Sequence, residues 1–406
     1  MSKVLAPLRR HLDLMPSPLP DTPGLVIRDP FRYADAMLVL PPPLIPCLML
    51  FDGDHDEGDL RVVLSRITGT VEVGDLARHL ADTLSASGFL QDDVFERLRD
   101  ARHGAFAAGE RREAVHAGSG YPDDPAALRE WVARSLEDGP VVAPEAGTLM
   151  GIAAPHVSPD GGWRSYAAAY SALTPDMRDR TFVILGTSHY GMPGRFGLTR
   201  KPFATPLGVT TVDTPRVDAL AAEGGPAVVA EDYCHAVEHS IEFQVVFLQH
   251  LYGAGIRILP ILCGPLGAGA ARPVPRDDAE VQRFLATLST VCAAAGEVVW
   301  ILGIDMAHIG QRYGDGTVVV ADEGPMRDVA ARDRARCGRI AAGDPDALWD
   351  LIEAGGEGDP LHWCGSSPAY AFLDAARPGR GALRHYEQWN IDPGSVVSFA
   401  AMAFYR

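Results

Sequence analysis

The chain of 406 residues is 47% hydrophobic and 22% charged, a composition typical of a globular protein with about two or three domains. Its formal net charge of -17 argues against nucleic acid as a partner, because phosphates attract basic surfaces, and it disfavours an anionic membrane surface. No run reaches the roughly 18 apolar residues of a membrane helix, and no apolar signal-peptide segment follows Arg9 and Arg10. We therefore expect a cytoplasmic protein without a membrane partner.

Residues 1–110 differ in pattern from the rest of the chain. Apolar residues recur at helical spacing over 60–67 and 73–84, and a short apolar segment follows at 87–91. Two helices and a short strand in this order predict a small winged-helix-like accessory domain. Its simplest role is packing or docking of a protein partner, with no chemistry of its own.

From about residue 111 strands alternate with helices. The predicted strands are 148–154, 181–187, 256–263 and 298–304. The predicted helices are 164–173, 239–252, 277–294, 325–341 and 345–353. Segments 382–389 and 396–405 resemble two further strands, joined by a turn and added antiparallel. Over 111–406 this predicts an α/β domain with a mostly parallel central sheet covered by helices on both faces.

Three of the predicted strands end in polar groups that can bind a metal. His156 and His189 follow the first two strands, and Asp305 follows the fourth, with His308 three residues further on. Ligands of open α/β sheets lie beyond the carboxyl ends of the strands, so these side chains should meet at one edge. A lone histidine is more often structural, but three such strand ends favour a metal or catalytic site.

Two imidazoles need a third ligand, and the residues leave the choice open. Asp305 with His308 is one candidate, although a carboxylate can equally orient a metal-bound imidazole. Cys364 is the other, because it precedes a predicted helix, and a helix N-terminus lowers the pKa of a thiol; it could also be an inert, half-buried thiol. His239 shares a helix face with Glu242, as an acid/base group or simply as a partner of the helix start.

Five segments, taken together, resemble the Memo family in the form called AmmeMemoRadiSam system protein B. They are Ala154-Pro-His156, Gly186-Thr-Ser-His189, Glu238-His-Ser-Ile-Glu242, Asp305-Met-Ala-His308 and Cys364-Gly365, in family order. The resemblance runs from about Val115 to the C-terminus and implies a fold similar to class III extradiol (LigB-type) dioxygenases. It implies iron or copper held by His156, His189 and Cys364. It also places Asp305 and His308 nearby, with His239 lining the pocket.

These features favour a mononuclear non-haem iron enzyme that activates O₂ on a small-molecule substrate. Two histidines and one anion holding Fe²⁺ leave positions open, as in facial-triad oxygenases. His239, Asp305 and His308 are the expected catalytic residues, with the histidines as general acids or bases. The alternative is a copper- or iron-binding or partner-docking protein without turnover, since Cu⁺ prefers thiolate. A Zn²⁺ hydrolase is a more distant alternative.

Overall fold

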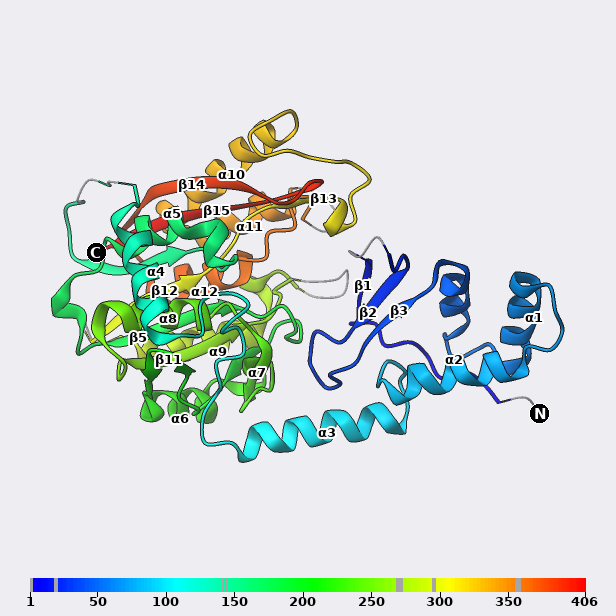
Figure 1. Cartoon of the computed structure of the whole chain (residues 1–406). Helices are drawn as coiled ribbons and strands as arrows, with labels where there is room; N and C mark the ends of the chain where they lie inside the picture. Colours follow the sequence, from blue (N-terminus) through cyan, green and yellow to red (C-terminus); the bar gives the residue numbers. More distant parts are fainter. Residues whose placement is uncertain are drawn as a thin grey trace. The chain divides into compact units, whose positions relative to one another are not determined.

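The computed structural model forms two compact units, Met1–Gly109 and Glu110–Arg406, each with its own hydrophobic core (Figure 1). The described residues are 3–17, 21–140, 142, 145–267, 273–293, 297–354 and 359–406. Within these ranges, no helix is both long enough and apolar enough to cross a membrane.

The N-terminal unit begins with a three-stranded antiparallel sheet and continues with helices. Its elements are β1 (Asp13–Pro16), β2 (Leu25–Arg28), β3 (Met37–Leu40), the 3-10 helix η1 (Pro42–Leu50), α1 (Glu57–Thr68), α2 (Gly74–Ala86) and α3 (Asp93–Ala108). Asp56 starts α1 with a capping box, because its carboxylate accepts the N–H of Asp59 and the Asp59 carboxylate accepts the N–H of Asp56. The apolar faces of α1 and α2 pack together in the core of the unit.

The order of these elements does not support the winged-helix-like arrangement expected from the sequence. The helices predicted over 60–67 and 73–84 form as α1 and α2. At the expected third element, however, Leu90 makes only an isolated antiparallel bridge with Leu8. The sheet comes instead from residues 13–40, in strands of four residues each, which are too short for an alternating pattern to stand out.

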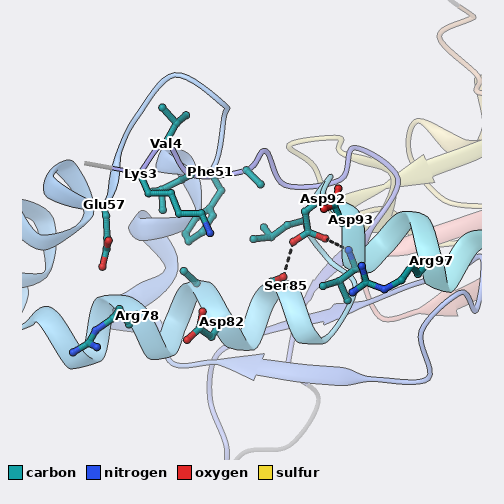
Figure 2. Close-up of a pocket in the computed structure, with 15 residues that line it drawn as sticks. Lys3, Val4, Phe51, Glu57, Arg78, Asp82, Ser85, Asp92, Asp93 and Arg97 are labelled. Carbon is teal, nitrogen blue, oxygen red and sulfur yellow. Dashed lines mark hydrogen bonds between the residues drawn. The ribbon is translucent and has the colours of Figure 1, made fainter. Parts of the chain in front are cut away.

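A groove of about 650 Å³ lies within the N-terminal unit. Its lining includes the apolar side chains of Leu5 and Phe51, while Lys3, Asp82 and Arg97 bring charges of both signs to it (Figure 2). Because both signs are present, the groove favours neither a purely anionic nor a purely cationic ligand.

A ten-stranded sheet forms the centre of the C-terminal unit. Along its main path lie β10 (Val228–Ala230), β6 (Phe196–Leu198), β11 (Arg257–Cys263), β5 (Thr181–Thr187), β12 (Val298–Gly303), β4 (Leu149–Ala154), β15 (Ser395–Tyr405) and β13 (His308–Gly310). Off this path, β14 (Arg380–Asp392) pairs with β15, and β9 (Thr211–Val212) pairs with β11. The four strands from β11 to β4 are parallel, and β15 joins them antiparallel. A separate small ladder joins β7 (Ala204–Thr205) and β8 (Gly208–Val209).

Helices flank this sheet (Figure 1). They are α4 (Pro125–Glu137), α5 (Pro159–Tyr170), α6 (Thr214–Glu223), α7 (Cys234–Val237), α8 (Glu242–Tyr252), α9 (Ala279–Val291), α10 (Met326–Ala341), α11 (Pro345–Glu353) and α12 (Ser366–Ala376). Short 3-10 turns are η2 (Pro175–Met177), η3 (Gly225–Ala227), η4 (Pro275–Asp277) and η5 (Gln311–Tyr313).

The strands are apolar on both sides, so both faces of the sheet are covered. On β5, Phe182 and Ile184 join one core with α4, α5 and α8, whereas Val183 and Leu185 join a second core with α9 to α12. The expected α/β class is therefore confirmed, and the four predicted parallel strands match β4, β5, β11 and β12 to within one residue. The predicted helix 277–294 forms as α9, although residue 294 lies outside the described residues.

The register of the parallel strands sets where the candidate site lies. Gly303 of β12 is paired with Ala154 of β4 on one side and with Gly186 of β5 on the other. All three strands run in the same direction, so the residues that follow them emerge at one edge of the sheet. His156, His189 and Asp305 come two or three residues after these partners, as the sequence predicts.

Candidate metal centre

Three imidazoles meet at this edge of the sheet. One ring nitrogen from each of His156, His189 and His239 lies within 4.8 Å of one from each of the others. The ring centroid of His189 is 5.0 Å from that of His156 and 5.0 Å from that of His239. His239 was expected as an acid/base group, and the structure brings it within range of sharing a cation with the other two.

Each of these histidines uses its Nδ1 atom for a fixed acceptor within the protein. His156 Nδ1 donates to the carbonyl oxygen of Gly303 at 2.9 Å. His189 and His239 direct Nδ1 to the carboxylate of Glu238, each at 3.0 Å. Carbonyl and carboxylate oxygens only accept, so each ring donates from Nδ1, and Nε2 is the nitrogen that remains to bind a metal.

Glu238 is a buried carboxylate, 1% exposed, that organises this part of the site. It accepts the backbone N–H groups of His189 and His239 at 2.9 and 2.8 Å, and that of Ser240 at 3.2 Å. Burial alone would raise the pKa of Glu238, but the charges and hydrogen bonds of His189 and His239 hold its pKa well below the ordinary value. The group is thus ionised at neutral pH, and its negative charge would favour a cation at this place.

Cys364 reaches the histidines from the turn before α12. Its Sγ lies 3.4 Å from His156 Nε2 and 3.8 Å from the carbonyl oxygen of Asp305. Two ligands bound tetrahedrally at about 2.0 and 2.3 Å from one zinc-sized cation would be about 3.5 Å apart, so the first distance fits a shared cation. Burial raises the pKa of the Cys364 thiol, but His156 and His308 outweigh burial and lower the pKa to about 5.

Asp305 and His308 take different places around this group. Asp305, 2% exposed, accepts the N–H of His156 at 2.9 Å, and its second oxygen lies 3.5 Å from His156 Nε2. His308 donates from Nδ1 to the carbonyl of Met306 at 2.9 Å, and its ring meets Tyr313 edge-on at 5.0 Å. Asp305 therefore touches a ligand candidate directly, while His308 acts through its charge on the Cys364 thiol.

Two residues that the sequence analysis did not assign also belong to the surroundings of the site. Glu238 appears above only as the first residue of one of the five family-like segments, although its position directly before His239 is a usable signal. The ring of His116 lies 5.6 Å from that of His239, and its Nε2 donates to the carbonyl of Val237 at 3.0 Å. His116 is distant in sequence from His239. It is held next to His239 because the carboxylate of buried Glu242 accepts its backbone N–H.

The chain is similar to proteins of one family. The family model described as Memo-like protein matches residues 112–403. A MEMO1 family protein of Aquifex aeolicus (strain VF5) is 25% identical over 406 residues, with 99% of this chain and 100% of that relative covered. One from Methanopyrus kandleri is 30% identical over 312 residues, and one from Desulfurococcus amylolyticus is 26% identical over 308 residues. In both comparisons the alignment spans 73% of this chain and 99% of the relative.

Proposed function

This chain belongs to the Memo-like protein family, and on that premise we propose that it is a mononuclear metal protein with ligands His156, His189 and Cys364. One observation supports the proposal most strongly. Two imidazoles with their Nδ1 atoms already occupied converge with a thiol 3.4 Å from His156 Nε2. Packing alone gives no reason to bring this set of donors together at a sheet edge.

The donor set fits a transition metal better than a hard cation such as Mg²⁺ or Ca²⁺. Neutral imidazole suits iron, copper and zinc, and thiolate favours the softer of these ions. A Fe²⁺ ion bound here would supply O₂ activation, which is the function that we favour. The residues fit such an ion because the lowered pKa of Cys364 makes the thiolate available at neutral pH.

The remaining polar residues suit orientation and proton transfer around such a centre. Asp305 holds the backbone of His156 in place, as carboxylates next to metal-bound histidines do. The charge of His308 acts on the Cys364 thiol, and among the described contacts its side chain makes no hydrogen bond to Asp305 or to the three histidines. We assign to His308 the role of moving a proton to or from a small-molecule substrate.

Metal loading tests the proposal. Protein reconstituted anaerobically with Fe²⁺ is expected to retain about one iron per chain. His189→Ala should lose this iron, whereas His250→Ala, which changes a histidine outside the site on α8, should retain it.

The third ligand is tested with Co²⁺: Cys364→Ala should abolish the thiolate-to-metal absorption band, and His239→Ala should preserve it. Full iron occupancy in His189→Ala would refute the metal site. An unaltered chain that shows no thiolate-to-Co²⁺ band and loses its Co²⁺ in His239→Ala would make His239 the third ligand instead.

The presence of the N-terminal unit favours an alternative function, in which the protein binds a metal and docks a partner without turnover. Two relatives align over 99% of their length with 73% of this chain, so they have no counterpart of the remaining part of the chain. The N-terminal unit therefore has a role other than supplying the metal centre. Its groove of mixed charge and apolar surface (Figure 2) suits a protein partner. A tight Cu⁺ complex that consumes no O₂ with any candidate substrate would favour this alternative over the enzyme.

A further inference from the structure

The two loops that carry Asp305 and Cys364 are joined to each other along their length. The N–H of His308 donates to the carbonyl of Leu361 at 2.9 Å, and the N–H of Gly365 donates to the carbonyl of Asp305 at 3.1 Å. His362 adds a third link, from its Nδ1 to the carbonyl of His308 at 3.0 Å. A Cβ atom at position 365 would lie closer than 3.0 Å to the Asp305 carbonyl, so this approach depends on glycine.

One buried carboxylate on α10 is linked to both loops, directly to one and through Ser398 to the other. Asp333 is 0% exposed and accepts hydrogen bonds from Trp363 Nε1 at 2.6 Å, Ser398 Oγ at 2.6 Å and Tyr386 OH at 2.8 Å. Trp363 is the residue before Cys364. Ser398 Oγ in turn accepts the N–H of Ala307 at 2.9 Å, within the segment from Asp305 to His308.

One turn further along α10, Arg336 holds the same loop from a second point. Its guanidinium makes two parallel bonds of 2.7 Å to the carboxylate of Asp359. Asp359 accepts the N–H groups of Leu361 and Trp363, both at 3.1 Å. The guanidinium carbon of Arg336 also lies 5.1 Å from the centre of a Trp363 ring. A planar fork of this kind fixes direction as well as distance.

Burying a carboxylate is costly, and an apolar residue would fill a core position on a helix more favourably. Asp333 nevertheless has three donors, and two of them, Trp363 and Ser398, connect it to the loops that carry Cys364 and Asp305. We propose that Asp333 and Arg336 are positioning residues that hold the Cys364 sulfur and Asp305 in place opposite the histidines. This inference rests on the proposed metal function, because the sulfur needs a fixed position only if it is a ligand.

The central test is Asp333→Asn, which keeps the shape of the side chain but leaves one acceptor atom for three donors. Metal affinity, measured by Co²⁺ titration, should fall about 10- to 100-fold, as for other groups that orient metal ligands. The thiolate-to-Co²⁺ band should shift or weaken. Asp328→Asn, an exposed carboxylate on the same helix, is the matched control and should behave as the unaltered chain. A Co²⁺ affinity and band unchanged in Asp333→Asn would overturn the proposal.

A milder variant and a double variant separate positioning from a general loss of folding. Trp363→Phe removes the indole N–H that reaches Asp333 together with part of the buried ring, and it should also weaken the band. In a Cys364→Ala background, Asp333→Asn should cause little further loss of Co²⁺ affinity if it acts through the sulfur. An equal loss in both backgrounds would show a merely structural role and reject the inference.

A measurement on the metal-free protein distinguishes failure of this inference from failure of the metal proposal. The N–H groups of residues 361, 362, 363 and 365 are all hydrogen-bonded, so they should exchange slowly with solvent. Exchange in 359–365 should accelerate at least tenfold in Asp333→Asn and stay unchanged in Asp328→Asn. If Cys364→Ala leaves Co²⁺ binding intact, the metal ligand is wrong; unchanged exchange in Asp333→Asn contradicts positioning itself.

Discussion

Glu238 accepts hydrogen bonds from the side chains of two histidines, and this fixes which nitrogen each ring presents. His189 and His239 both direct Nδ1 to its carboxylate, so a single substitution here would release two rings at once. His156 relies instead on the backbone carbonyl of Gly303, which no side-chain substitution removes. The three rings therefore differ in how they respond to mutation, although they converge on one point.

His116 makes the stability of the C-terminal unit depend on pH. Burial lowers its pKa from 6.5 to about 4, against the opposing charge of Glu242. Between these values the unfolded chain binds a proton that the folded chain does not, so stability falls as pH drops through this window. His116→Gln retains a donor for the Val237 carbonyl and lacks this proton. Between pH 7 and pH 5, we expect the unfolding free energy of His116→Gln to fall by about 2 kcal/mol less than that of the unaltered chain.

Urea unfolding followed by tryptophan fluorescence measures this difference. All six tryptophans of the chain lie between Trp131 and Trp389, so the signal reports on the C-terminal unit alone. The same pH dependence in His116→Gln and in the unaltered chain would mean that His116 is not held neutral by burial.

The glycines that end β5 and β12 allow the segment with His239 to approach the sheet. A Cβ atom on Gly303 would lie closer than 3.0 Å to the backbone oxygen of Ser240, and one on Gly186 would lie equally close to the Ser240 hydroxyl. Ser240 also donates from Oγ to the carbonyl of Thr187 at 2.8 Å. A glycine within a strand often marks such an approach of another backbone.

Gly303→Ala should therefore damage both the fold and the site. The obstacle is backbone rather than a flexible side chain, so we expect a loss of about 1–3 kcal/mol in unfolding free energy and weaker metal binding. Gly338→Ala is the matched control, because it lies on α10 with nothing within 4 Å of the added Cβ. It should be neutral or slightly stabilising. Equal stability of the two variants in urea would contradict this account of the β12 terminus.

The sequence predicts the long strands of the C-terminal unit well, but it predicts only some of the residues of the candidate site. Long apolar runs place β4, β5, β11 and β12 to within one residue, because each strand is buried on both faces. The same strands then predict where His156, His189 and Asp305 lie. The position of His239 depends on tertiary packing around Gly186 and Gly303, which periodicity does not encode. The strands of the N-terminal unit are too short to give a pattern.

The two units differ in what they contribute to the molecule. Every residue of the candidate site lies in the C-terminal unit, which has its own hydrophobic clusters on both faces of the sheet. The family match over 112–403 and the shorter relatives, which lack a counterpart for about a quarter of this chain, indicate that this part is sufficient for the family's common architecture. The N-terminal unit adds a second core and a groove.

A fragment of residues 110–406 should therefore fold and bind metal as the full chain does. We expect the same tryptophan-detected urea midpoint and the same Co²⁺ affinity, because no residue of the proposed site lies before residue 110. If the fragment aggregates or loses its metal, the N-terminal unit is needed for the integrity of the metal centre and is more than an accessory.

Strand β15 determines when, during synthesis of the chain, the proposed centre can first form. It lies between β4 and β13 in the sheet, and its Ser398 accepts hydrogen bonds from the backbone of Met306 and Ala307. The ribosome adds this strand after every donor atom of the centre, which takes a few seconds more at about 5–20 residues per second. A nascent chain that ends short of this strand carries all the proposed donors but lacks the support of Ser398 for the segment after Asp305, so the proposed centre can form fully only after β15 has been made.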